Sequence, residues 1–416
     1  MKKGRREFVK SLAGAAVIAP GAAASRFPQG PTMETAKPYD IAVIGAGVFG
    51  AWSAYHLQRA GKKVALVDAY GPANSRASSG GESRIIRMGY GPNELYTRWS
   101  IRSLELWKGF FARAGKPLFH RTGVFWMMHE GDQYSLDSLA MLQKLKVPHQ
   151  RLTRPELEKT YPQIDFGTVA WGILEPESGA LMARRAVQAV VDEVVRNGGE
   201  YRVGAITQPR GQKSVAMVTT GTGETISAGI YIFACGPWLP KIFPDLLGGR
   251  IRPTRQEVFF FGIPPGDKRF SPPAMPVWID LTNEYYGFPD LESRGFKIAL
   301  DRHGPPHDPD STNRVVSPEQ LREVREILGK RFPGLKDAPV VETRVCQYEN
   351  TSNGDFLIDR HPDFDNVWLV GGGSGHGFKH GPALGEYVAR LVTQGATTEH
   401  RFSLATKEKV DARSVF

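Results

Sequence analysis

A glycine-rich turn followed by an acidic residue is the clearest chemical pattern in this sequence. The apolar run from Tyr39 to Ile44 leads into Gly45-Ala-Gly-Val-Phe-Gly50, and a second apolar run ends in Asp68. Gly45 allows a tight turn, Gly47 lets backbone N–H groups approach a pyrophosphate, and Gly50 lets the following helix pack closely on the strand. Asp68 is well placed to accept a hydrogen bond from a ribose 2′-hydroxyl. The pattern predicts a dinucleotide-binding unit and leaves FAD and NAD both open.

A second glycine-rich turn lies near the other end of the chain. The apolar strand expected at 366–370 runs into Gly371-Gly-Gly-Ser-Gly-His-Gly-Phe-Lys-His-Gly381, and a helix is expected from Pro382 to Val392. The N-terminus of such a helix favours negative charge. Two glycine-to-helix turns at opposite ends of the chain suit a large cofactor that is held from both sides.

Basic side chains and cysteines could carry further chemistry. Arg84 and Arg87 are three residues apart, which would place both guanidinium groups on one side if the segment is helical. The planar fork of a guanidinium matches the two oxygens of a carboxylate. Lys297 lies in an alternating run that is typical of a sheet strand. The chain has two cysteines, Cys235 and Cys346, so far apart in sequence that a disulfide scaffold is not expected.

Length and composition describe an ordinary globular chain of 416 residues, 41% hydrophobic, with a net charge of +10. Five basic side chains against Glu7 give the first 24 residues a charge of +4 and leave +6 for the rest. Elsewhere, no run of Lys and Arg with interleaved aromatics is present. We therefore expect a solvated basic surface around an anionic cofactor and substrate, and no nucleic-acid partner.

Residues 1–24 have the composition of an export signal. The pair Arg5-Arg6, with Phe8 and Lys10 behind it, precedes a short apolar stretch from Leu12 to Ala19 and the small residues 22–24. This order is typical of a signal peptide, and the arginine pair resembles a twin-arginine signal. The apolar stretch is too short to span a membrane. We expect twin-arginine-type export to the periplasm or the outside, with no stable membrane anchor; a plain secretory peptide or a disordered basic tail is the alternative.

The order of several motifs is similar to the monomeric sarcosine oxidase and N-methyl-tryptophan oxidase family, FAD-dependent amine oxidases of the D-amino-acid-oxidase-like superfamily. The resemblance covers roughly Tyr39 to Val392. Besides the turn at Gly45, the stretches that carry it are Ser79-Gly-Gly-Glu-Ser-Arg-Ile-Ile-Arg87, Ile230-Tyr-Ile-Phe-Ala-Cys-Gly-Pro-Trp238, Tyr286-Gly-Phe-Pro with Lys297 downstream, and Cys346-Gln-Tyr348 continuing through Asp355-Phe-Leu-Ile-Asp359 to Ser374-Gly-His-Gly-Phe-Lys379.

The resemblance implies a cofactor and a set of site residues. The cofactor is FAD, with Cys346 at the position that the family bonds to the flavin, and with Gly236 and Gly375 as further cofactor contacts. Arg84 would lie against the flavin, while Lys297 would face it and activate dioxygen as a fixed cation. The residues implied around a small amine substrate and its carboxylate are Arg87, Lys379, Tyr286, Tyr348 and His376. No metal is expected.

The implied reaction is oxidation of a secondary amine or N-methyl amino acid to an imine that hydrolyses, while dioxygen is reduced to hydrogen peroxide. The protein is expected to be a monomer. Three alternatives stay open: a flavin dehydrogenase that uses an electron carrier, a flavin-binding subunit without turnover, and an NAD-dependent enzyme. The sequence departs from the family at Asp301, where the family often has a histidine. An acid there would change the preference for charged amines.

These segments together predict an α/β chain, α+β overall. A Rossmann-like FAD-binding domain is assembled from separated segments and interleaved with a mainly antiparallel β domain on the substrate side, where short β-type runs such as 123–128 and 257–262 occur. The predicted ranges are 1–24 for the export signal, 25–37 for a linker, 38–119, 168–236 and 340–402 for FAD binding, 120–167 and 237–339 for the substrate domain, and 403–416 for a C-terminal tail.

Overall fold

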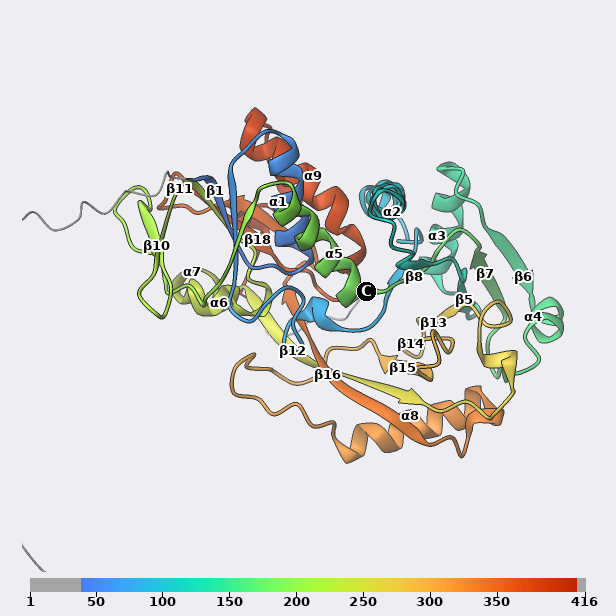
Figure 1. Cartoon of the computed structure of the whole chain (residues 1–416). Helices are drawn as coiled ribbons and strands as arrows, with labels where there is room; N and C mark the ends of the chain where they lie inside the picture. Colours follow the sequence, from blue (N-terminus) through green and yellow to red (C-terminus); the bar gives the residue numbers. More distant parts are fainter. Residues whose placement is uncertain (1–38, 410–416) are drawn as a thin grey trace, which may run out of the picture. The chain divides into compact units, whose positions relative to one another are not determined.

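Apolar runs from distant parts of the sequence pair in the first sheet of the computed structural model, which describes residues 39–409. The order is β17-β18-β11-β1-β2-β9, with β10 paired to β11. Figure 1 labels β1, β10, β11 and β18 of this sheet. The pairs from β18 to β9 are parallel, whereas β17 and β10 run antiparallel to their neighbours. The strands are β1 (Tyr39–Ile44), β2 (Val64–Asp68), β9 (Glu200–Val203), β10 (Met217–Thr219), β11 (Thr225–Phe233), β17 (Leu357–Arg360) and β18 (Val367–Gly371).

Three helices pack together beside this sheet. Helix α1 (Val48–Arg59) follows the first glycine turn and contacts both α5 (Ala183–Arg196) and α9 (Gly381–Gln394). The approach of α9 is close because a Cβ at Gly385 would lie 2.5 Å from the carbonyl carbon of Trp52 on α1. The helices and the sheet share one large hydrophobic core. Helix α9 therefore brings the second glycine turn next to the first.

The second sheet is mainly antiparallel, in the order β16-β12-β15-β14-β13-β5-β7-β6, with one parallel pair between β13 and β5. Helix α8 (Pro318–Arg331) packs on β12 and β15 (Figure 1). Its apolar face joins the phenylalanines of both strands in a separate core. The strands are β5 (Val124–Met128), β6 (Gln150–Thr153), β7 (Trp171–Glu175), β12 (Ile251–Phe261), β13 (Val277–Asp280), β14 (Tyr285–Phe288), β15 (Phe296–Leu300) and β16 (Val340–Thr351).

A small third sheet, in the order β3-β8-β4, carries the arginine segment. Its strands are β3 (Arg84–Ile86), β4 (Phe119–His120) and β8 (Gly179–Leu181). The remaining helices of the described residues are α2 (Glu94–Ala114), α3 (Gln133–Lys144), α4 (Arg154–Thr160), α6 (Leu239–Ile242) and α7 (Pro244–Leu247), with the 3-10 turns η1 (Ser78–Gly80), η2 (Gly236–Trp238), η3 (Lys268–Phe270), η4 (Pro333–Leu335), η5 (Phe378–His380), η6 (His400–Phe402) and η7 (Leu404–Thr406).

The fold class expected from the sequence is confirmed, with corrections in detail. Arg84 is the first residue of strand β3, and the segment is not helical. The three-residue spacing of Arg84 and Arg87 therefore does not put both side chains on one helix face. Strands β7 and β16, expected in the FAD-binding ranges, instead pair in the second sheet. The described residues, 39–409, belong to a single contact unit, so the interior domain boundaries stay predictions.

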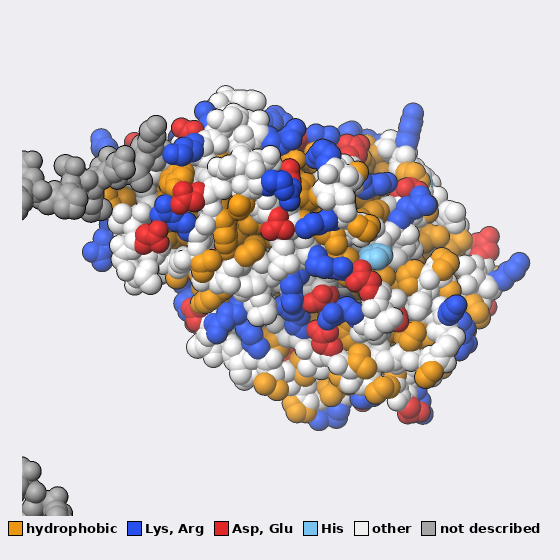
Figure 2. All heavy atoms as spheres, viewed as in Figure 1, with side chains coloured by type: hydrophobic (Ala, Val, Ile, Leu, Met, Phe, Trp, Pro, Cys, Tyr) orange, Lys and Arg blue, Asp and Glu red, His pale blue; other side chains and the backbone are white. Residues whose placement is uncertain are grey.

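The expected export signal at 1–24, the linker at 25–37 and tail residues 410–416 lie outside the described residues. Among residues 39–409, none of the helices has the length and apolar character needed to cross a membrane. On the face that Figure 2 shows, basic and acidic side chains are interspersed with apolar ones.

The closeness of the first glycine turn to α1 yields a stability prediction. Alanine is normally favoured over glycine inside a helix by about 0.5–1 kcal/mol. A Cβ at Gly50, however, would lie 1.8 Å from the carbonyl oxygen of Gly45, so Gly50→Ala must displace backbone. We expect Gly50→Ala to lower the free energy of unfolding by about 3 kcal/mol in urea titrations.

Gly109 in the middle of α2 is the matched control. The nearest atom to a Cβ there is the end of the flexible Arg113 side chain, at 3.3 Å. Gly109→Ala should therefore leave stability unchanged or raise it by up to about 1 kcal/mol. Equal unfolding free energies for the two variants would contradict the close packing at Gly50.

Candidate functional site

The first glycine turn forms one wall of a cavity of about 530 Å³. Gly45 has φ +105°, and a Cβ there would lie 2.3 Å from the carbonyl oxygen of Ala234 at the end of β11. The turn therefore needs glycine for both its conformation and its contact with the neighbouring strand. Gly47 also lines the cavity, whereas Gly50 supports it from behind through the packing described above.

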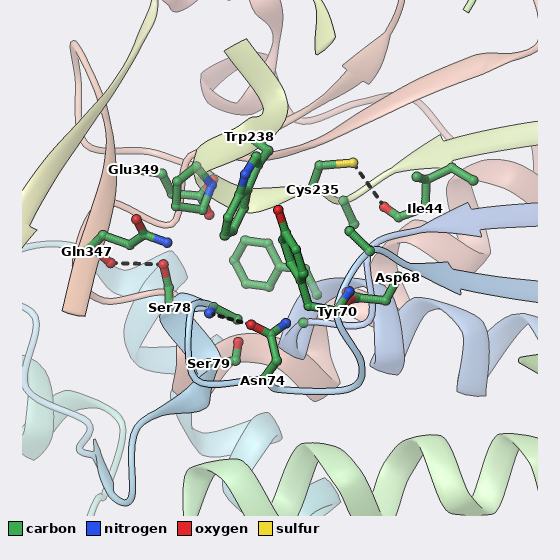
Figure 3. A pocket seen from close by; sticks show the side chains of 18 of the residues that line it. Ile44, Asp68, Tyr70, Asn74, Ser78, Ser79, Cys235, Trp238, Gln347 and Glu349 are labelled. Carbon is green, nitrogen blue, oxygen red and sulfur yellow. Dashed lines mark hydrogen bonds between the residues drawn. The ribbon is translucent and has the colours of Figure 1, made fainter. Parts of the chain in front are cut away.

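Asp68 lies at the end of β2, on the rim of the same cavity (Figure 3). Its carboxylate accepts backbone N–H groups from Ala46 at 2.8 Å, Tyr70 at 2.9 Å and Gly71 at 3.0 Å. Burial raises its pKa, and these donors act in the opposite direction. Since a carboxylate offers about four lone-pair positions, one stays open for a hydroxyl donor. The position suits the expected ribose contact, which itself stays a prediction.

Gly236 follows the end of strand β11 and lines the same cavity. Gly236 has φ +53° and lines the cavity beside Cys235. The Cys235 thiol donates to the carbonyl oxygen of Ile44 at 3.4 Å (Figure 3). Burial, helped by Asp68 and Glu349, raises the pKa of this thiol. A buried thiol of this kind is a packing group rather than a nucleophile.

Strand β16 crosses the far wall of the cavity with Cys346 near its middle. The Cys346 side chain is buried, lines the cavity and accepts a hydrogen bond from Nη2 of Arg84 at 3.1 Å. The same Nη2 donates to the carbonyl oxygen of Ser78 at 2.6 Å, which fixes the guanidinium in place. Arg84 thus holds the Cys346 sulfur at the cavity wall through a hydrogen bond from a charged donor.

A second cavity of about 380 Å³ adjoins the first. Both cavities are lined by Arg84, Tyr348, Gly375 and Phe378, so these residues mark their junction. Gly375 has φ +81°, and a Cβ there would lie 2.9 Å from the ring of Tyr348. The other expected substrate residues lining the second cavity are Arg87, Tyr286, His376 and Lys379. The fold thus brings residues from widely separated segments to one place.

Arg87 and Lys379 give the second cavity two buried cationic side chains. The Arg87 guanidinium lies 4.4 Å from the ring centroid of Tyr90 and 4.7 Å from that of Trp126, and it donates to the carbonyl oxygen of Gly89. The Lys379 ammonium donates to the Tyr90 hydroxyl at 2.8 Å. Burial, together with Arg87, holds the pKa of Lys379 well below its usual range. A bound anion would restore the charged form.

Asp301 supplies the opposite charge in the same cavity. It follows β15, and its carboxylate accepts the hydroxyl of Tyr348 at 2.7 Å. Burial raises the pKa of Asp301, while the Tyr348 hydrogen bond and the charges of Arg87 and Lys379 act to lower it. The cavity therefore holds an acid and two basic groups without a direct ion pair between them among the described residues.

Lys297 lies on β15 as the alternating sequence predicts, but it does not line either cavity. Its ammonium donates to the carbonyl oxygen of Ser83 at 3.1 Å and lies 4.2 Å from the ring centroid of Phe288. Burial and the charge of nearby Arg84 hold its pKa well below the usual range. Lys297 thus contacts Ser83, the residue before Arg84, and Arg84 lines both cavities. The role of Lys297 toward dioxygen stays a prediction.

Sequence reasoning missed several residues of the site. Tyr90 joins Lys379 to two histidines, with its hydroxyl 3.2 Å from Nδ1 of His376 and 2.8 Å from Nε2 of His380. Because His376 Nε2 lies 3.0 Å from the carbonyl oxygen of Gly354, that nitrogen carries the proton. Glu349 was missed because its burial results from tertiary packing.

The fold and the site together define a class of protein. A parallel sheet with a glycine turn leading into α1, and an acid at the end of the next strand, is the arrangement that binds dinucleotides. A second cavity for a small molecule adjoins the first, as an enzyme with a bound redox cofactor requires. The described residues contain no group of three or more side chains arranged to hold a metal ion. These features are those of a dinucleotide-dependent oxidoreductase.

Comparison with known proteins identifies the family. The model of the FAD dependent oxidoreductase (DAO) family matches residues 40–391, and the chain belongs to this family. The monomeric sarcosine oxidase of Arthrobacter sp. (strain TE1826) is 30% identical over 381 residues, which cover 89% of this chain and 96% of that protein. N-methyl-L-tryptophan oxidase of Salmonella arizonae is 28% identical over 369 residues, covering 86% of this chain and 95% of that protein.

A solved structure has the same fold. The L-proline dehydrogenase from P. horikoshii matches with a TM-score of 0.75 at 22% identity, covering 88% of this chain and 97% of that one. The family membership confirms FAD over NAD as the cofactor and confirms the resemblance inferred from the motifs. The first cavity fits FAD, because glycine turns line it on both sides and a buried oxygen of Glu349 is left without a partner there.

Proposed function

We propose that this FAD-dependent oxidoreductase oxidises a secondary amine or N-methyl amino acid that carries a carboxylate. The observation that carries the proposal is the second cavity, which meets the FAD cavity at Arg84 and Tyr348 and holds the buried basic groups of Arg87 and Lys379. Relatives named as sarcosine and N-methyl-L-tryptophan oxidases support this substrate class.

The substrate carboxylate would lie between Arg87 and Lys379. Arg87 is held between two aromatic rings, so little side-chain entropy is lost when it binds an anion. Lys379 gains its charge as the carboxylate arrives, since its pKa is depressed by burial. Tyr286 supplies an aromatic wall that excludes water from the reacting carbon.

The bound amine must be neutral when it reacts. FAD supplies the acceptor for a hydride equivalent from the carbon next to the amine nitrogen. The chain orients that carbon through the substrate carboxylate that Arg87 and Lys379 bind. The resulting imine hydrolyses to an aldehyde or ketone and a free amine.

Dioxygen is the electron acceptor that we propose, with hydrogen peroxide as the product. Lys297 would stabilise the negative charge that develops on oxygen, because its buried amine is fixed by the carbonyl oxygen of Ser83 and gains its proton as that charge appears. Cys346 would hold the flavin through a thioether to its 8α-methyl carbon, supported by its place in the FAD cavity and its contact with Arg84. We further propose a monomer that is exported through the signal at residues 1–24.

Anaerobic reduction of the flavin tests the proposed reaction. The yellow protein is mixed without air with each member of a panel of N-methyl and cyclic amino acids. At least one of them should bleach the flavin absorbance. Admitting air should then restore the colour rapidly and produce peroxide. Lys297→Met should slow the return of colour by at least about tenfold and leave bleaching nearly unchanged, because one positioned charge typically contributes this much to a rate.

The outcomes of this test separate the rival functions. Bleaching without recovery in air, with Lys297→Met equal to the parent, would favour a dehydrogenase that uses an electron carrier. No bleaching by any amine would sink the enzymatic proposal and favour a flavin-binding subunit. Lys268→Met on η3 is a control for charge removal alone, since that lysine lines neither cavity.

Asp301 should set the preference for charged amines. A carboxylate in the second cavity favours a substrate with a second positive charge, and burial raises its pKa, so this preference is lost as the pH falls and the carboxyl is protonated. We expect Asp301→Asn to lower kcat/KM for N-methyl amino acids with a basic side chain by about tenfold, which is about 1.4 kcal/mol. Neutral N-methyl amino acids should change much less.

Exposed Asp337 gives the matched control. Asp337→Asn removes the same charge outside both cavities and should leave both classes of substrate unaffected. Equal losses for basic and neutral substrates in Asp301→Asn would mean that Asp301 only positions Tyr348.

A further inference from the structure

Glu349 is a buried acid in the FAD cavity that the proposed reaction does not use. It lies on β16 with 8% of its surface exposed, and it lines the cavity beside Trp238 (Figure 3). Its Oε1 accepts the backbone N–H of Gly373 at 3.2 Å. Its Oε2 is buried and has no hydrogen-bond partner among residues 39–409. A native fold rarely leaves such an atom unsatisfied unless a ligand completes it.

Nothing near Glu349 compensates a negative charge. None of the other titratable groups that line the cavity hydrogen-bonds to Glu349 among the described residues; they are Asp68, Tyr70, Arg84, Cys235, Lys241, Asp310, Cys346 and Tyr348. Burial raises the pKa of Glu349 to about 7, while the N–H groups of Gly373 and Gly372 act to lower it. Below that pH the carboxyl is neutral, and Oε2 can carry a proton to donate.

The position of Glu349 indicates which part of a ligand it meets. It follows Cys346 by three residues on the same strand, a distance of about 10 Å along an extended chain. A Cβ at Gly236 would lie 3.8 Å from Oε2, and one at Gly371 would lie 3.4 Å from it. The unpartnered oxygen thus lies where the glycine turns after β11 and β18 come together.

We propose that Glu349 is a cofactor-positioning residue that is protonated in the working enzyme and donates a hydrogen bond from Oε2 to an oxygen of the ribityl–pyrophosphate chain of FAD. The glycines around it leave room for that chain, and a neutral acid does not repel the phosphates as a carboxylate would. The inference rests on FAD binding alone, so it holds or fails independently of amine oxidation.

FAD affinity in the Cys346→Ala background tests the proposal, because no thioether can form there and the cofactor is held by non-covalent contacts. The Cys346→Ala protein with Glu349 intact is the parent of this series. In flavin-fluorescence titrations it should bind FAD about tenfold more weakly at pH 8.5 than at pH 6, because one hydrogen bond is lost. Glu349→Gln keeps an N–H donor and should bind equally at both pH values. Glu349→Leu should bind about tenfold more weakly at pH 6.

Riboflavin locates the accepting oxygen, since it has the ribityl chain without phosphates. A similar penalty of Glu349→Leu with riboflavin identifies a ribityl hydroxyl, and a penalty confined to FAD identifies a phosphate oxygen. The control is Glu326→Gln, at an exposed position of α8, and this variant should bind FAD like the parent. Equal FAD affinity of the parent at both pH values, or of Glu349→Leu and the parent at pH 6, would overturn the proposal.

Thermal unfolding of the intact holoenzyme is a second test that does not need the Cys346→Ala variant. The pKa of Glu349 is higher in the folded protein than the ordinary value of 4.5. The folded state therefore binds more protons, and this contribution to stability falls as the pH rises through about 7. The Tm should fall more between pH 6 and 8.5 in the parent than in Glu349→Gln; identical slopes would contradict a protonated Glu349.

Discussion

The pairing of β16 with β12 is the constraint on which the rest of the site depends. The ladder runs from Ile251 opposite Thr351 to Phe261 opposite Val340, with one irregularity near its end. A shift of one residue would turn every side chain of β16 to the other face. Cys346 and Tyr348 are two residues apart and share one face of β16, so the register decides that this face meets the first cavity and, at Tyr348, its junction with the second. The long antiparallel pair thereby spans from one cavity to the other.

Both cavities contain titratable groups that the protein itself leaves incompletely paired. Lys379 is buried beside Arg87 and loses charge, whereas Glu349 is buried away from any cation and gains a proton. Each arrangement costs folding free energy, because burial penalises the charged form. An anion in the second cavity and an oxygen acceptor in the first would relieve these costs. The same physical effect thus supports both proposals, the carboxylate position in the second cavity and the cofactor contact in the first.

Local patterns predicted the parts of the site that depend on few neighbours. The glycine turn, the strand ending at Asp68 and the second turn before α9 follow from backbone sterics and from continuous apolar runs, and the structure has them. Spacing failed for Arg84 and Arg87, because a three-residue strand pairs with β8 instead of forming a helix. Neither the place of Lys297 behind Ser83 nor the burial of Glu349 could be predicted, since both follow from contacts between segments far apart in sequence.

Acid precipitation of the purified protein tests most directly whether β16 holds FAD at the junction of the two cavities. If Cys346 anchors the flavin, the yellow colour stays in the washed pellet of the parent, and in Cys346→Ala it moves to the supernatant. Cys235→Ala should behave like the parent, because that thiol contacts the backbone of Ile44 instead of Arg84. Yellow supernatants from both the parent and Cys346→Ala would contradict the anchoring at β16, and a colourless parent protein would contradict FAD binding altogether.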